Sequence, residues 1–273
     1  MKNTLLLLAV WSYSAIAMAQ NGQNTNQNPV KVKHAEPLFI DLIRDLGALK
    51  GEREWNVGMA LVDQLNWDKY ETLVEYEWAP RDRLGLEIEI PVTFYAPVTR
   101  NLESTRPNNQ IESLKLAAQW SFFVSTRTNS SMALGYLNEL NTNDFEKSQS
   151  AFWFTGNTFN PFLVAAKRWG SQFHSLIYTG PRFILDFASS DWSMRYAVHT
   201  SFHYMVPGSR NFVGVEVNKF WGSADFDMTI RPQMRLAISE QLMMGIVTGI
   251  PIRRENERFS TFLRLIYEPK HGH

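Results

Sequence analysis

The sequence has no cysteine among its 273 residues. This absence excludes disulfides, thiol nucleophiles, cysteine-ligated metal sites and attachment of lipid to an N-terminal cysteine. An excess of charge of one sign is also missing, because 27 basic residues balance 27 acidic ones. Since no Lys- or Arg-rich run occurs, we expect no nucleic-acid partner.

Long apolar runs are absent too, because no stretch approaches the roughly 20 apolar residues that a membrane-spanning helix needs. The short apolar run at residues 5–10 follows Lys2 and precedes Ala17-Met18-Ala19, the order typical of a signal peptide cleaved before Gln20. An uncleaved membrane anchor is the alternative, but the run is short and no stop-transfer charges follow it. We predict a signal peptide at 1–19 and a flexible, Asn- and Gln-rich leader at 20–33.

Residues 69–95 instead alternate with a period of two on both sides of a turn at 80–82. Successive side chains of a strand point to opposite faces, so each of these two strands has one apolar face. The opposite faces carry an acidic row formed by Glu71, Glu75, Glu77, Glu87 and Glu89. Membrane-spanning barrel strands of roughly 9 to 11 residues have this pattern, with the apolar side outward.

The same alternation recurs through residues 53–268 and predicts about twelve strands, followed by a tail at 269–273. The two longest connections, at 97–109 and 140–157, follow the third and fifth strands and so fall at the same end, where extracellular loops belong. The predicted fold class is all-β: a transmembrane antiparallel up-and-down β-barrel. Its apolar exterior would face the lipid bilayer of the outer membrane.

Residues 34–52 predict a short amphipathic helix ahead of the barrel. Pro37 suits a first helical turn, and Gly51 suits the end of the helix. Apolar residues at helical spacing form a contact face of Phe39, Leu42, Ile43, Leu46 and Leu49. The helix could pack on the periplasmic rim, plug the mouth of the barrel, or bind another periplasmic or envelope protein.

The segment HAEPLFIDLIRDLGALKGEREWNVG, residues 34–58, resembles the opening of an uncharacterised family of exported barrel proteins. The layout of the mature chain is similar to that of the transporter-like outer-membrane barrels grouped with the MetA pathway of phenol degradation. These resemblances imply an outer-membrane barrel related to transport. The chain departs from such barrels because they end on an aromatic residue, whereas here Tyr267 is followed by six more residues.

The inward faces of the later strands carry a basic row: Arg182, Arg195, Arg231, Arg235 and Arg264. We expect it to face the acidic row across the lumen, where opposed charges would filter small polar solutes. Twelve strands lie between the roughly 8 that leave room only for side chains and the 16 to 18 that leave an aqueous channel. The sequence therefore predicts a small-solute channel, with a sealed structural or partner-binding barrel as the alternative, and no cofactor.

Two patterns in the sequence suggest an enzyme or a metal site instead. His199-Thr200-Ser201 resembles the His-x-Ser pair of outer-membrane phospholipases, and a His beside a Ser can activate a hydroxyl nucleophile. Both residues point inward by alternation, however, and a lipid-cleaving site should open to the bilayer. His174, His199 and His203 could bind a metal, but with no matching carboxylate nearby we interpret them as polar lumen residues.

Overall fold

A computed structural model describes residues 30–40, 42–43, 45–64, 66–97, 107–144, 153–223, 225–254 and 257–270. The predicted signal peptide, most of the leader and the end of the tail lie outside these ranges. Among the described residues, no helix is long and apolar enough to cross a membrane.

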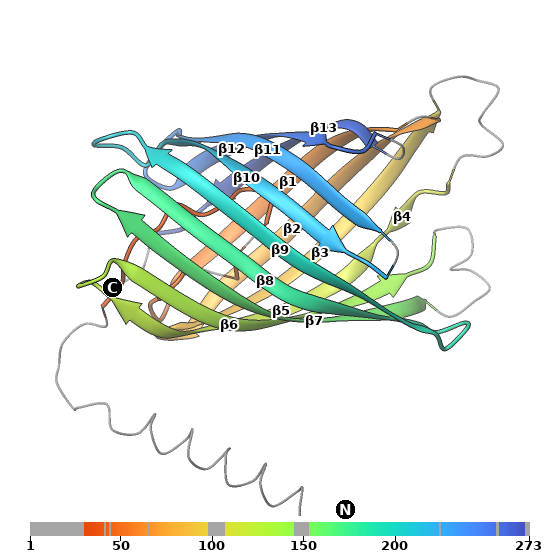
Figure 1. Ribbon diagram of the computed structural model, residues 1–273, viewed down its shortest axis with the longest axis horizontal. Helices are drawn as coiled ribbons and strands as arrows, with labels where there is room; N and C mark the ends of the chain where they lie inside the picture. The colour runs from red at the N-terminus through yellow and green to blue at the C-terminus, as the bar shows by residue number, and fades with distance from the viewer. Residues whose placement is uncertain are drawn as a thin grey trace, which may run out of the picture.

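The described chain forms twelve long strands and one strand of two residues. They are β1 (Arg53–Gln64), β2 (Trp67–Arg81), β3 (Leu84–Pro97), β4 (Gln110–Ile111), β5 (Ser113–Ser125), β6 (Ser130–Thr142), β7 (Phe154–Trp169), β8 (Phe173–Asp186), β9 (Trp192–Met205), β10 (Phe212–Trp221), β11 (Phe226–Ala237), β12 (Leu242–Pro251) and β13 (Glu257–Tyr267). Neighbouring long strands pair antiparallel, and β1 pairs with both β2 and β13. The sheet therefore closes into a twelve-stranded barrel (Figure 1), as predicted.

The connections divide into two sets, one at each end of the barrel. At the end where β13 terminates, which we call the turn end, β2–β3, β5–β6, β7–β8, β9–β10 and β11–β12 are joined by short turns. The longest connections, 98–112 and 143–153, join β3–β5 and β6–β7 at the opposite loop end, as predicted. The second is shorter than the expected 140–157, because β6 and β7 extend into it.

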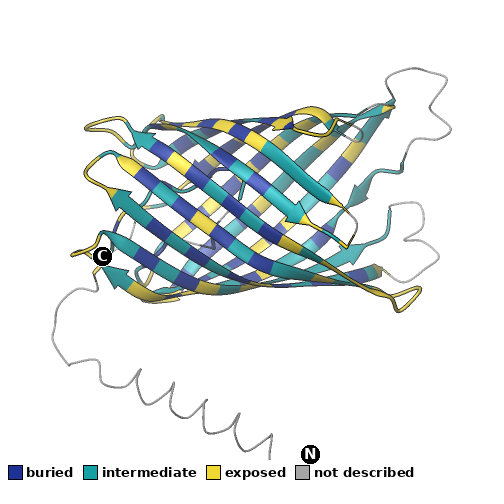
Figure 2. Cartoon of the chain, in the orientation of Figure 1, coloured by how far each residue is buried: buried dark blue, intermediate teal, exposed yellow. Residues whose placement is uncertain are grey.

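Side-chain burial alternates along the strands and produces the checkered pattern of Figure 2. Val74 is 51% exposed on the outside, whereas the next residue, Glu75, is 0% exposed on the inside. Large apolar and aromatic side chains cover the exterior, and the polar side chains point into the barrel. Trp55 and Tyr267 are exposed opposite each other near the turn end, and Trp192 and Trp221 are exposed near the loop end. These positions match two interfacial aromatic belts.

Residues 30–52, here called the inner segment, lie inside the barrel at its turn end. The described residues of this segment contain bends and turns but no helix, so the predicted helix at 34–52 is not confirmed. Asp41 and Arg44 lie outside the described residues. A helix would satisfy its own amides, but here several amides donate to side chains of the barrel wall. Gly47, inside the predicted helix, has φ near +88°, a conformation that a continuous helix does not allow.

The apolar residues of the inner segment pack on the barrel wall, in two clusters. Leu42, Ile43 and Leu46 contact one cluster, formed with residues of β5 to β8 such as Phe162. Leu38 joins a second cluster with residues of β10, β12 and β13. The predicted contact face therefore lies mainly against the inside of the barrel, with Leu42, Ile43 and Leu46 at most 3% exposed. Burial of this surface is the main force that holds the segment in the lumen.

Candidate functional site: the barrel lumen

The inner segment closes the turn end of the lumen and leaves a cavity of about 640 Å³ on its other side. Phe39, Ile40 and Ile43 of the inner segment border this cavity. Asp225 and Arg253, in the β10–β11 and β12–β13 connections, also line it, so the cavity reaches the loop end. The lumen is therefore a chamber with a floor at the inner segment.

Wall side chains act as hydrogen-bond acceptors for the backbone of the inner segment. The N–H of Leu38 donates to Gln233 Oε1 at 2.7 Å, and the N–H of Ile40 donates to Glu216 Oε1 at 3.1 Å. The N–H of Ala35 donates to His174 Nδ1 at 2.6 Å. The wall thus replaces the hydrogen bonds that regular secondary structure would supply.

These bonds also fix the orientation of the buried amide and the ring beside it. Because Gln233 Oε1 accepts the Leu38 amide, Gln233 Nε2 must donate, and it lies 3.1 Å from His203 Nε2. His203 Nε2 is therefore the acceptor and must be unprotonated. The bond between Leu38 and the wall therefore depends on this arrangement of donors and acceptors at Gln233 and His203.

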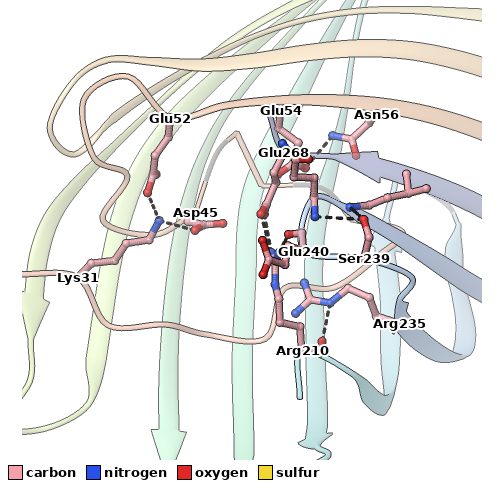
Figure 3. Close-up of polar contacts among 12 residues, drawn as sticks. Lys31, Asp45, Glu52, Glu54, Asn56, Arg210, Arg235, Ser239, Glu240 and Glu268 are labelled. Carbon is pink, nitrogen blue, oxygen red and sulfur yellow. Dashed lines mark hydrogen bonds and ion pairs between the residues drawn. The ribbon is translucent and has the colours of Figure 1, made fainter. Parts of the chain in front are cut away.

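Ion pairs at the turn end join the start of the inner segment to its last residues (Figure 3). Lys31 Nζ lies 2.5 Å from Asp45 and 2.7 Å from Glu52. Burial alone would lower the pKa of Lys31, but the two carboxylates outweigh it and raise the pKa above its ordinary value. Nearby, Arg210 Nη2 donates to both oxygens of the Glu268 carboxylate at 2.7 Å. This contact fixes the chain just after β13, directly before the tail.

The acidic row lies inside the barrel, but its cationic partners come mostly from neighbouring strands. Glu75 is 2.8 Å from Arg264, and Glu89 is 2.5 Å from Lys115. Arg264 belongs to β13, which is separated from β2 only by β1. The expectation of two rows opposed across the lumen is therefore wrong for this pair, because closure of the sheet brings the last strand beside the first ones.

Glu71 pairs with Lys69 at 2.5 Å on the same strand. Glu77 accepts a hydrogen bond from Asn56 Nδ2 at 3.1 Å, and that amide also donates to Glu75. Glu87 borders the cavity. The acidic row is therefore part of a hydrogen-bonded polar wall.

The basic row has similarly local partners. Arg182 pairs with Glu139 at 3.0 Å, and Arg195 pairs with Asp227 at 2.5 Å. Arg231 donates to Asn218 Oδ1 at 2.8 Å and lies over the Phe39 ring at 3.4 Å. Arg235 lies over the Phe212 ring, 4.8 Å from its centre. Four of the five arginines line the cavity: Arg182, Arg195, Arg231 and Arg264.

Within the described residues, one group of carboxylates is close enough to hold a metal ion: Glu75, Glu87 and Glu89, with oxygens within 4.8 Å of one another. Arg264 and Lys115 already supply positive charge to Glu75 and Glu89. These contacts account for two of the three carboxylates without a metal, so we assign no metal site to this group.

The histidines of the wall bind polar neighbours rather than a nucleophile. His199 Nδ1 lies 3.2 Å from Asn218 Nδ2, and the buried Ser201 hydroxyl has no hydrogen-bond partner among the described residues. His174 and His203 are cross-strand neighbours on β8 and β9. The Ser–His contact that a hydrolase needs is not formed within the described part of the chain.

Sequence reasoning missed the residues that hold the floor. Glu216, Asn218 and Gln233 are all buried on the inner wall. Glu216 and Asn218 alternate with Val213, Val215 and Val217, so their inward orientation could have been read from the period of two. Their role could not, because the amides that Glu216 and Gln233 bind belong to a segment more than 170 positions away in the sequence, and Asn218 acts only by donating to Glu216.

The sequence and the fold were compared with known proteins. The profile of the HAEPLYID-like family matches residues 30–268. No curated protein sequence matches the chain. The structure is similar to an outer membrane channel from Pseudomonas putida F1, with a TM-score of 0.65 and 12% identity over 84% of this chain and 100% of the other.

Two porins also have a similar fold. The NanC porin has a TM-score of 0.57 and 8% identity, and the KdgM porin has a TM-score of 0.54 and 12% identity. Each comparison covers 79% of this chain and 99% of the porin. The chain therefore has the fold of outer-membrane channel barrels, whereas the predicted grouping with the MetA pathway is not confirmed.

Proposed function

The chain belongs to the HAEPLYID-like family, and we propose that it is an outer-membrane channel for small polar solutes, gated by its own inner segment. The observation that carries this proposal is the chamber of about 640 Å³, bordered by charged wall residues on its sides and by the inner segment below. A chamber lined by charged groups that reaches one end of an apolar cylinder is the arrangement expected of a solute path across a bilayer, provided that the floor can move. The similar barrels named as channels and porins support it at the level of the fold.

Solute passage requires the inner segment to move, because it fills the turn end. The backbone of the segment is irregular and binds side chains of the wall, so the segment can move without separating any two strands of the barrel. The signal peptide predicted at 1–19 would export the chain.

Conductance in planar lipid bilayers tests the proposal. The full-length mature chain should give discrete current steps, and Glu87→Gln should reduce cation preference because Glu87 lines the cavity. Glu240→Gln is the matched control, since Glu240 is 89% exposed at the rim and lies outside the lining. A correctly folded protein without current steps, in both the wild type and variants that weaken the floor, would contradict the channel.

A sealed structural barrel is the second candidate function. The extensive pairing of wall charges favours a sealed structural barrel, since such a polar core needs no solute. Absence of conductance in every variant would support this second function, as would crosslinking of the barrel to another envelope protein. The phospholipase alternative has no comparable support, because Ser201 does not contact His199.

A further inference from the structure

The wall of the chamber carries a row of aromatic rings on four adjacent strands. Phe162, Tyr178, His199 and Phe220 come from β7, β8, β9 and β10, and their ring centres are 4.7, 5.5 and 4.8 Å apart in that order. All four border the cavity. Phe220, at one end of the row, is half-buried, whereas the other three are buried. Its ring is therefore the most exposed of the four; His199 meets it edge to face, and the Arg195 guanidinium lies 5.3 Å from its centre.

Ion pairs lie beside this aromatic row. Four pairs contribute both of their members to the cavity lining: Lys115–Glu89, Arg182–Glu139, Arg195–Asp227 and Arg253–Asp225. Each pair presents a cationic donor next to a carboxylate acceptor. A hydroxyl group can accept from the first and donate to the second without disturbing the charge balance.

The described lining is also nearly neutral, with seven carboxylates and six lysine or arginine side chains. A charged solute would find no excess of opposite charge there and would have to compete with the existing ion pairs. An uncharged solute can bind without competing with these ion pairs. The lining therefore favours neutral molecules that are rich in hydroxyl groups.

We propose that this chamber binds an uncharged, polyhydroxylated ring compound, the chemistry of a neutral mono- or disaccharide. Phe220 would contact the apolar face of the ring, and the Arg195–Asp227 and Arg182–Glu139 pairs would bind its hydroxyls. The volume lies within the range of about 300 to 1,000 Å³ that is typical of small-molecule pockets. The proposal rests on the proposed channel function, since the pocket is the outer part of the solute path.

Isothermal titration calorimetry on the full-length protein in detergent tests the proposal independently of conductance. The probes are maltose as a neutral disaccharide, digalacturonate as an anionic one, and phenol as an aromatic solute. Maltose should bind saturably and more tightly than the other two. Tighter binding of digalacturonate or phenol, or no binding of maltose, would overturn the proposal, whereas the channel would stand if current steps persist.

Two variants examine the residues in the proposal. Phe220→Leu keeps much of the volume and removes the ring, so maltose affinity should fall about two- to tenfold. Phe202→Leu is the control, because Phe202 is 48% exposed on the outer face of β9. Glu139→Gln leaves Arg182 without its carboxylate and should shift preference from maltose to digalacturonate. Unchanged affinities in both variants, with the heat-modifiable gel migration of a folded barrel retained, would contradict the assignment.

Discussion

The buried carboxylate of Glu216 on β10 accepts a hydrogen bond from the backbone N–H of Ile40, at 3.1 Å. Phe39, the preceding residue, donates to the other oxygen of the same carboxylate at 3.4 Å. One wall side chain therefore holds two consecutive amides of the segment that closes the lumen. We therefore infer that Glu216 holds the inner segment, which forms the floor of the chamber, against the barrel wall.

Glu216→Ala should loosen the inner segment. A typical hydrogen bond contributes about 0.5 to 1.5 kcal/mol, so the loss of two should cost about 2 kcal/mol and raise the open population roughly 30-fold. Hydrogen–deuterium exchange of the peptide containing Phe39 and Ile40 measures this directly. Glu216→Gln retains an acceptor oxygen and should have a smaller effect. Equal exchange in the wild type and Glu216→Ala would contradict this role of Glu216.

A disulfide should lock the inner segment in place. A Cβ atom added at Gly245 would lie 3.2 Å from Leu38 Cγ, close to the separation between a Cβ and the far sulfur in a disulfide. Because the chain has no other cysteine, Leu38→Cys with Gly245→Cys can form only this intramolecular bond. We expect current steps only after reduction, with each single variant insensitive to the reductant. Equal conductance of the oxidised and reduced forms would mean that the segment does not gate the lumen.

Lys31→Met should loosen the start of the inner segment, because the variant removes the cation that Asp45 and Glu52 share near the end of the same segment. Removing one partner of a buried ion pair costs about 3 to 5 kcal/mol of stability. Because these groups are partly exposed, we expect a loss of about 1 to 2 kcal/mol. The rate of proteolysis within residues 30–52 should rise accordingly. Lys33→Met is a matched control on an exposed lysine two residues away, and a similar rise in both variants would refute a specific role for Lys31.

Acidification should weaken the attachment of the inner segment through His34. Burial, assisted by His174 and Arg168, lowers the pKa of His34 from 6.5 to about 4, while Asp45 acts in the opposite direction. A lowered histidine pKa means that the docked state favours the neutral ring. Its contribution is complete above pH 6.5 and is lost as the pH falls toward 4.

Hydrogen exchange of residues 30–40 should therefore accelerate between pH 6.5 and 4, after correction for the intrinsic pH dependence of exchange. His34→Gln should remove part of this acceleration, because glutamine does not titrate and can still bind the Ser131 hydroxyl. An identical pH profile in the variant would exclude His34 as a contributor. The remaining acceleration would belong to other groups such as His174, whose Nδ1 accepts the Ala35 amide.

Much of the wall could be predicted from the sequence, because strand alternation is a local property. Val74 and Glu75 face opposite sides of β2 because they are adjacent in the chain and successive side chains of a strand point to opposite faces. The strand number and the common end of the two long connections follow from that pattern and from parity. The helix at 34–52 is not confirmed, because an apolar spacing of 3 and 4 residues indicates which side chains are buried but not which groups bind the backbone amides.

The sequence by itself determined an apolar exterior, a polar interior and a series of antiparallel strands, since each depends on neighbours a few positions apart. Only the tertiary structure decided the pairing of Glu75 with Arg264 and the docking of Ile40 on Glu216. These contacts join positions separated by 189 and 176 residues; closure of the barrel brings the first pair together, and the position of the inner segment in the lumen brings the second together. A period of two fixes the side of the wall on which a residue lies, whereas its partner inside the lumen depends on the curvature of the whole barrel.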